Sequence, residues 1–290
     1  MSNSNTNIDL QTARKDFVNH LKKLSRSTAT ILAYNKDIDQ LIQFVKKNKI
    51  NNPNELTSEH TEGFKSNLAN QNYTAKSISR KLNSIKTFCK FLMEKAIITQ
   101  NPALLIAHPK YKIKPPRILT KMEYRALRDA CKDDIRIYAI IEFLLQTGIR
   151  IGELANLELN DIDVDKITIK PYESHGQRVV PLNKPAQQAI TSYLKIRPKT
   201  KTKKIFVTKN GRQFLIRNIR TAIDRYFKLA DIKNVKVNDL RHTFIAHQLK
   251  AGTPLTLISQ LVGHKRLSTT EKYLTVVTPK PSSPATLKEL

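Results

Sequence analysis

Residues 147–154 read TGIRIGEL, and they decide how the second half of this chain is interpreted. Arg150 follows a glycine break at the point where a helical pattern begins. An arginine at that position directs its guanidinium group, together with the free amides of the helix start, toward an anion. Taken alone, such a stretch more often contains an ordinary surface arginine than a functional one, so the rest of the chain must decide.

Three further motifs follow in order: residues 238–244 read NDLRHTF, residues 261–264 read LVGH, and residues 269–274 read TTEKYL. His264 lies 23 residues after Arg241 and nine residues before Tyr273. A lone tyrosine on a helix is usually a packing or surface residue. Only its spacing to Arg241 and His264 sets Tyr273 apart from such a residue.

Together the four motifs resemble the tyrosine recombinase (phage integrase) family, whose catalytic domain reads T-G-x-R-x-x-E-L, H-x-L-R-H-T-F and L-G-H, with a tyrosine nine residues later. Residues 24–34 (LSRSTATILAY), 77–92 (SISRKLNSIKTFCKFL) and 101–103 (NPA) resemble the core-binding domain of the same family. The resemblance therefore covers almost the whole chain. Within this family, the chain is similar to the compact two-domain members, which are Xer-like enzymes and transposon resolvases.

The resemblance implies a site-specific recombinase that cleaves and rejoins DNA through a 3′-phosphotyrosyl intermediate and a Holliday junction. Its expected partners are double-stranded DNA recombination sites, bound by a homotetramer made of two dimers. Its expected role is integration or excision, or the resolution of mobile DNA or replicon dimers. A type IB topoisomerase-like enzyme, a non-catalytic DNA-binding relative and a general basic structural protein remain as alternatives.

The resemblance also assigns roles to individual residues. Tyr273 would be the nucleophile, Arg150 and Arg241 would hold the scissile phosphate, and His264 would hydrogen-bond a phosphate oxygen or assist proton transfer. Glu153 would orient Arg150. Because the tyrosine ester stores the energy of the cleaved bond, neither a metal nor another cofactor is expected.

The chain departs from the family pattern at two positions. Asn238 stands where the family usually has a histidine, and an amide can donate a hydrogen bond but cannot shuttle a proton. The family's β-hairpin lysine, which protonates the leaving 5′ oxygen, aligns with Glu173. Lys170 is the candidate for that role, and His175 is the alternative acid. His242 is expected to be structural.

The predicted fold is mainly α with a small β-sheet, an α+β class. Residues 1–106 are predicted to form a helical, SAM-like core-binding domain, residues 107–116 a proline-punctuated linker, and residues 117–290 a catalytic domain with a tail, the two domains closing as a C-shaped DNA clamp. Apolar periods predict helices near residues 121–131, 134–146, 152–157, 216–230, 239–250 and 254–261, and strands at 166–170, 178–182 and 205–208. The tail, 279–290, is expected to dock on a neighbouring protomer.

The charge of the chain indicates a polyanionic partner. It carries 51 Lys and Arg against 24 Asp and Glu, a net charge of +27, spread along its whole length. Such an excess repels itself unless nucleic acid or another polyanion neutralises it. The basic face of the helix expected near residue 85 is predicted to contact DNA through Lys76, Arg80, Lys81, Lys86 and Lys90.

Several other classes of protein are not favoured. No run approaches the roughly 18 apolar residues that a membrane span needs, and no export signal is visible, so a cytoplasmic protein without membrane partners is expected. Cys89 and Cys131 have neither C-x-x-C nor metal-like spacing, and they are expected to be buried thiols without a function.

Overall fold

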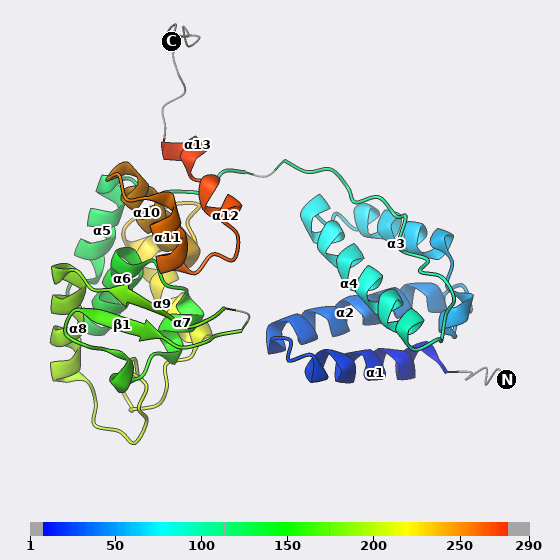
Figure 1. Cartoon of the computed structure of the whole chain (residues 1–290), viewed down its shortest axis with the longest axis horizontal. Coiled ribbons are helices and arrows are strands. Elements are labelled where there is room, and N and C mark those ends of the chain that lie inside the picture. Colours follow the sequence, from blue (N-terminus) through cyan, green and yellow to red (C-terminus); the bar gives the residue numbers. More distant parts are fainter. Residues whose placement is uncertain (1–7, 113, 174, 278–290) are drawn as a thin grey trace, which may run out of the picture. The chain divides into compact units, whose positions relative to one another are not determined.

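The computed structural model describes residues 8–112, 114–173 and 175–277 (Figure 1). The chain divides into two compact units, Met1–Ile113 and Lys114–Leu290, and this division lies inside the predicted linker, residues 107–116. The tail predicted to dock on a neighbour, residues 279–290, lies outside the described residues. Within the described residues no helix combines the length and apolarity that crossing a membrane requires.

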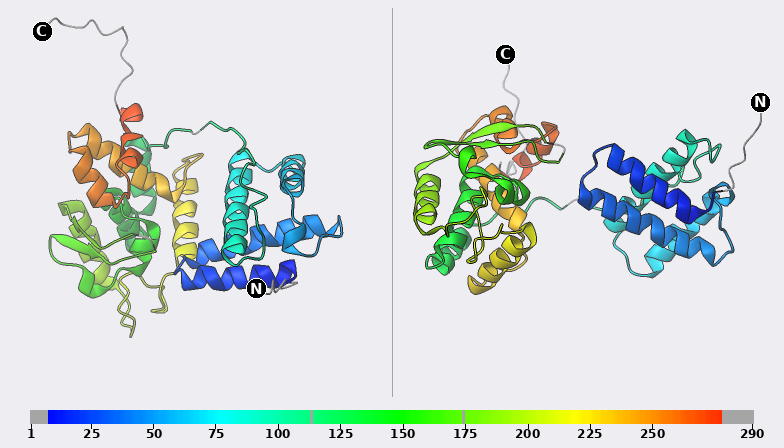
Figure 2. Two further views of the ribbon diagram at one scale, coloured as in Figure 1. Left: turned by 45° about the vertical axis from the view of Figure 1, so that its right-hand side comes forward. Right: turned by 90° about the horizontal axis from the view of Figure 1, so that it is seen from below.

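The first unit is helical throughout its described part. Its elements are α1 (Leu10–Lys23), α2 (Thr28–Lys46), the short 3-10 helix η1 (Pro53–Glu55), α3 (Ser58–Asn70) and α4 (Ala75–Glu94). Each of the four α-helices begins after a polar cap whose side chain accepts a bond from a backbone amide of the first turn: Asp9, Ser27, Thr57 and Thr74. The views of Figure 2 show α1 and α2 lying side by side. Their apolar faces meet α4 around Phe17, Ile38 and Phe88, and the described part of this unit is helical as predicted.

One buried ion cluster joins α2 to α4. Asp37 of α2 accepts bonds from the Lys81 ammonium group at 2.8 Å and from the Ser84 hydroxyl at 2.7 Å, while Arg80 reaches it with both terminal nitrogens. Only 4% of Lys81 is exposed, so its charge faces Asp37 and not a ligand. The prediction that Lys81 contacts DNA is therefore corrected. Lys76, Arg80 and Lys90 are exposed, and Lys86 is half-buried, donating to the Ile106 carbonyl.

Replacing Asp37 with alanine is expected to destabilise the first unit by about 3–5 kcal/mol, because the Lys81 charge would remain buried without its partner. The measurement is the free energy of unfolding in urea. Asp39→Ala is the matched control, since Asp39 pairs with Arg14 at 2.6 Å across a partly exposed surface and is expected to be worth less than about 1 kcal/mol. Equal losses in the two variants would contradict a special role for the buried cluster.

The second unit is helical with one small sheet. Its elements are α5 (Lys121–Cys131), α6 (Ile135–Thr147), α7 (Ile151–Asn156), η2 (Leu159–Asp161), β1 (Lys166–Ile169), β2 (Arg178–Pro181), α8 (Lys184–Ile196), α9 (Ile216–Leu229), α10 (Val237–Lys250), α11 (Leu255–Val262), α12 (Ser268–Glu271) and α13 (Leu274–Val277). β1 and β2 pair antiparallel, with Lys166 opposite Pro181 and Ile169 opposite Arg178. The apolar α6 lies in the core and contacts α5, α8 and α10. The predicted α+β class is confirmed.

Three details of the second unit differ from the prediction. Residues 205–208 form no regular strand in the described part, because only single bridges such as Val207 to Gln213 involve them. Helix α8 was not predicted, although Asn183 caps it and a proline stands in its first turn. Helix α10 begins at Val237, so Arg241 lies one turn inside the helix and not at its start.

Candidate active site

Two glycine turns bring the predicted motifs together. Gly148 ends α6 in a left-handed conformation, with φ of 61°, and a Cβ there would come within 2.3 Å of the Phe244 ring of α10. Gly263 ends α11 in the same way, with φ of 68°. A glycine is favoured at both positions because other residues rarely adopt this conformation. The turns place Arg150 next to the last carbonyl groups of α11.

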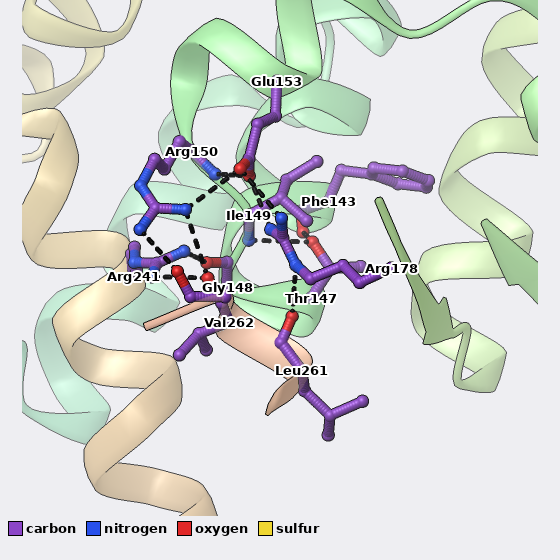
Figure 3. Close-up of polar contacts among 11 residues, drawn as sticks. Phe143, Thr147, Gly148, Ile149, Arg150, Glu153, Arg178, Arg241, Leu261 and Val262 are labelled. Carbon is purple, nitrogen blue, oxygen red and sulfur yellow. Dashed lines mark hydrogen bonds and ion pairs between the residues drawn. The ribbon is translucent and has the colours of Figure 1, made fainter. Parts of the chain in front are cut away.

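Arg150 and Arg241 lie beside each other and share a backbone acceptor. Arg241 donates to the carbonyl oxygens of Gly148 at 2.6 Å and Val262 at 2.7 Å. Arg150 donates to the same Val262 oxygen at 3.3 Å and to that of Gly263 at 3.0 Å (Figure 3). The structure therefore brings together the two arginines that the sequence singled out, one from the start of α7 and one from α10.

A third arginine, Arg178 of β2, was missed in the sequence. Its terminal nitrogens bind both carboxylate oxygens of Glu153, at 2.9 and 2.6 Å, and its Nε donates to the Leu261 carbonyl at 2.7 Å. Arg150 binds Glu153 from the other side, at 3.0 Å (Figure 3). We call Arg150, Arg178 and Arg241 the arginine cluster. The buried glutamate of the TGIRIGEL stretch was the available signal, since a buried carboxylate requires fixed cationic partners.

The arginine cluster leaves an excess of positive charge in a desolvated place. Burial acts to raise the pKa of Glu153, but hydrogen bonds from Arg178 and Arg150 outweigh it and lower that pKa, so the carboxylate stays ionised. Burial and the charge of Arg150 lower the pKa of Arg241 to about 9, so this guanidinium is still charged at neutral pH. One carboxylate against three guanidinium groups makes the site attractive to an anion such as a phosphodiester.

Tyr273 lies next to this positive site. It stands between the short helices α12 and α13, is 6% exposed, and belongs to one buried apolar cluster with Phe244, Ile258 and Val262. Burial raises the pKa of the Tyr273 phenol to about 12, opposed by the charge of Arg241 and reinforced by that of Asp239. The phenol is therefore protonated at neutral pH, and it must lose its proton if it is to attack a phosphate.

His264 is held between the arginine cluster and Tyr273. Its Nδ1 lies 2.8 Å from the Thr270 hydroxyl, and its ring stacks on that of Tyr273 at 6.4 Å between centroids. Burial, then the charges of Arg241 and Arg150, lower the pKa of His264 to about 4. His264 is thus a neutral imidazole near pH 7, suited to hydrogen bonding and not to carrying charge.

Asn238 and His242 occupy successive turns of α10 beside Tyr273. The Asn238 amide nitrogen lies 2.7 Å from Nε2 of His242, and the ring of His242 meets that of Tyr273 edge-on at 5.8 Å between centroids. His242 was predicted to be structural, and the structure places its ring against that of the candidate nucleophile. The sequence signal was its four-residue distance from Asn238, which is one helical turn.

Lys170, the candidate acid, forms ion pairs with residues outside the arginine cluster. Its ammonium group is bound by Glu158 at 2.7 Å and by Asp161 at 2.9 Å, and neither carboxylate contacts an arginine of the cluster. These bonds raise the pKa of Lys170, which makes it a weaker acid. These contacts do not favour Lys170 as the acid, and that assignment stays a prediction.

His175, the alternative acid, lies closer to the chemistry. It lines one shallow hollow together with Arg178, His264 and Lys265. Burial, then the charge of Arg150, lower its pKa. Its backbone is fixed by a pair of bonds to Tyr172, at 3.1 and 3.0 Å. Lys265 is a further basic residue of this hollow that the sequence did not indicate.

Neither cysteine has access to solvent or to the site. Both are buried, and burial raises the pKa of Cys89 and of Cys131 to about 12, so their thiols are unreactive. Among the described residues no group of three or more His, Cys, Asp or Glu side chains is arranged to hold a metal ion.

Comparison with known proteins agrees with this geometry. The model of the phage integrase family matches residues 117–278, and that of the phage integrase N-terminal SAM-like domain matches residues 15–96. Tyrosine recombinase XerC of Thermodesulfovibrio yellowstonii is 30% identical over 273 residues, which cover 89% of each chain.

Two solved structures share the fold. The Tn1549 transposon integrase in complex with transposon right end DNA has a TM-score of 0.79 at 18% identity, covering 92% of this chain and 94% of that one. A lambda integrase tetramer bound to a Holliday junction has a TM-score of 0.75 at 14% identity, covering 91% of this chain and 80% of that one. The chain belongs to the phage integrase family, the tyrosine recombinases, enzymes that break and rejoin DNA at specific sites.

Proposed function

We propose that Tyr273 attacks a DNA phosphate held by Arg150 and Arg241 and forms a 3′-phosphotyrosyl intermediate, the first step of strand exchange through a Holliday junction. The observation that carries this proposal is the shared carbonyl of Val262, which brings the two guanidinium groups together beside Tyr273. Both arginines now give their hydrogen bonds to backbone carbonyls. A phosphate would take over some of these donors, and its negative charge would match the excess of the arginine cluster.

The proposed partners are double-stranded recombination sites bound by four copies of the chain. The net charge of +27 supports a DNA partner, and the solved neighbours of the same fold were captured on DNA. In the first unit, the exposed Lys76, Arg80 and Lys90 together with Lys86 would neutralise backbone phosphates. These contacts give affinity without reading sequence, so they leave the target site open.

A covalent trap tests the proposal. The full-length chain would first select a binding site from a library of random duplexes. A nick placed just beyond the scissile phosphate lets the short cleaved fragment diffuse away, so that the covalent intermediate accumulates. We expect an adduct on the peptide that contains Tyr273. A protein that binds the site without forming an adduct would be a non-catalytic relative, and relaxation of supercoiled DNA without site preference would indicate a topoisomerase.

We propose further that His175 protonates the leaving 5′ oxygen. Its place in one hollow with Arg178 and His264 supports this role, whereas Lys170 is engaged by Glu158 and Asp161. His175→Ala is expected to slow cleavage by about 10²-fold. Cleavage by the unchanged protein should also fall as the pH rises through the pKa of His175, because only the protonated imidazole can donate.

A substrate with sulfur in place of the bridging 5′ oxygen provides the control. A thiolate leaves without being protonated, since its pKa is near 8.5. The His175→Ala defect should therefore disappear on the sulfur substrate. Lys170→Ala and Lys265→Ala should cleave both substrates at the unchanged rate. A His175→Ala defect of equal size on the two substrates would refute the assignment, and a defect of Lys265→Ala that sulfur removes would transfer the role to Lys265.

A further inference from the structure

A chain of three polar side chains runs along α10 beside Tyr273. Asp239 Oδ1 lies 3.1 Å from Nδ1 of His242, and the Asn238 amide nitrogen lies 2.7 Å from Nε2 of the same ring. The second oxygen of Asp239 accepts the Lys236 backbone amide at 2.8 Å and so closes the N-terminus of the helix. The carboxylate is thereby fixed from two sides.

The partners of His242 determine its tautomer. An ionised carboxylate can only accept, so Nδ1 carries the proton and donates it to Asp239. An amide nitrogen can only donate, so Nε2 of His242 presents its lone pair to Asn238. A carboxylate and an imidazole that carries its proton on Nδ1 and an acceptor lone pair on Nε2 are the components that activate a hydroxyl nucleophile in other hydrolytic and transfer sites.

The alternatives for receiving the proton of Tyr273 are weaker. Among the described residues, the titratable or charged groups that interact with His242 or Tyr273 include Arg241, Asp239 and His264. Arg241 has no lone pair to offer, and Asp239 is committed to the helix start and to His242. Burial, and then the positive charges of the nearby Arg241 and Arg150, disfavour the protonated form of His264.

We propose that His242 is the general base for Tyr273, and that it takes over the task of the histidine which this chain lacks at position 238. The proton of the Tyr273 hydroxyl passes to Nε2 of His242 while the phenolic oxygen bonds to phosphorus. The bond from phosphorus to the 5′ oxygen breaks, and that oxygen takes a proton from the acid on the hairpin side. When the strands rejoin, His242 returns its proton to the departing Tyr273.

In this scheme Asn238 blocks Nε2 of His242 until a phosphate binds. Its amide nitrogen lies 2.7 Å from Nε2 of His242 and engages the lone pair of that nitrogen. A phosphate held by the arginine cluster offers the Asn238 amide a charged acceptor, which makes a stronger hydrogen bond than a neutral imidazole. Its departure frees Nε2 for the Tyr273 hydroxyl. Activation of the nucleophile is thus coupled to occupation of the phosphate site.

The experiment measures the rate of adduct formation on the nicked site as a function of pH, and it rests on the proposed function, because unchanged protein must form the adduct at all. His242→Ala is expected to lower the rate by about 10²-fold near pH 7. On the substrate with sulfur in place of the bridging 5′ oxygen, which needs no acid, the rate of the unchanged protein should rise with pH to a plateau, as expected when a general base must be unprotonated. In His242→Ala that plateau should be lost, with the rate still rising toward the pKa of the tyrosine.

Two further variants separate catalysis from structure. His247→Ala removes an exposed histidine from the same helix, and it should leave both the rate and the pH profile unchanged. Asn238→His combined with His242→Ala returns an imidazole to the adjacent turn, and it should recover at least tenfold of the lost rate and restore the plateau. A His242→Ala protein that keeps the unchanged rate, or that is slower with the plateau still present, would overturn the proposal while leaving Tyr273 as nucleophile.

Discussion

Tyr273→Phe is expected to abolish the covalent adduct, a loss of more than ~10⁴-fold in cleavage rate, because no other group can form the ester. The substitution should leave the fold intact. The Tyr273 ring packs in an apolar cluster with Phe244 and Ile258, and its hydroxyl has no hydrogen-bond partner among the described residues. We therefore expect the free energy of unfolding to change by less than about 1 kcal/mol. Gel retardation on the selected site should show unchanged affinity.

Tyr226→Phe is the matched control for this prediction. Tyr226 belongs to the same unit and is also buried, 7% exposed, and its hydroxyl lies 3.2 Å from a carboxylate oxygen of Asp134. Loss of that bond should cost stability and leave adduct formation at the unchanged rate. An adduct that persists in Tyr273→Phe would remove the central claim about the nucleophile.

Most of the helices and the main site residues were predictable because local signals specify them. The apolar periods of α5 and α9 give their limits almost to the residue, since each helix buries one continuous stripe. Arg150, Arg241, His264 and Tyr273 stand in short motifs whose mutual spacing is informative without any tertiary knowledge. Their convergence depends on two glycine turns, and both glycines are part of those motifs.

The missed features arise from contacts between segments far apart in the sequence. Helix α8 buries Ala186, Ala189, Ile190 and Tyr193, and because two of these four are alanines, few large apolar residues mark the helix in the sequence. The run at residues 205–207 resembles a strand because it is apolar throughout, yet Phe206 is buried by stacking on Tyr193 at 5.2 Å. Arg178 belongs to no local motif, and only the folded hairpin brings it to Glu153.

Two lysines show how charge alone misleads. Lys81 was assigned to DNA because it is basic, although it stands three residues after Ile78 and so shares the buried face of α4. Asp37, the residue that stabilises it there, lies 44 residues away. Lys170 is likewise engaged by two carboxylates. In a chain with so many cations, burial beside a carboxylate removes Lys81 from the surface that could meet DNA, whereas Arg80 binds the same Asp37 and stays exposed.

The second large effect is expected for Arg241→Ala, which should slow adduct formation by about 10³-fold or more. Arg241 is 5% exposed, and its donors reach the carbonyl groups of Gly148 and Val262 at the place where the phosphate would lie. Desolvation lowers its pKa to about 9, so the bare guanidinium is under-solvated and gains more than a surface arginine from an incoming anion. Arg241→Lys should recover little, since an ammonium group cannot reproduce the planar fork of donors.

Arg125→Ala is the matched control for Arg241, because it removes the same charge from an exposed position of α5. If the substitutions lowered the rate of adduct formation only by weakening the long-range attraction of DNA, both variants would be slower. This loss of rate would vanish at high salt because exposed charges are screened. The loss in Arg241→Ala should instead persist at high salt, since the guanidinium acts at contact distance in a desolvated site. If raising the salt concentration removed the difference between the two variants, Arg241 would be contributing only to DNA attraction, and the phosphate site would have to be sought elsewhere in the second unit.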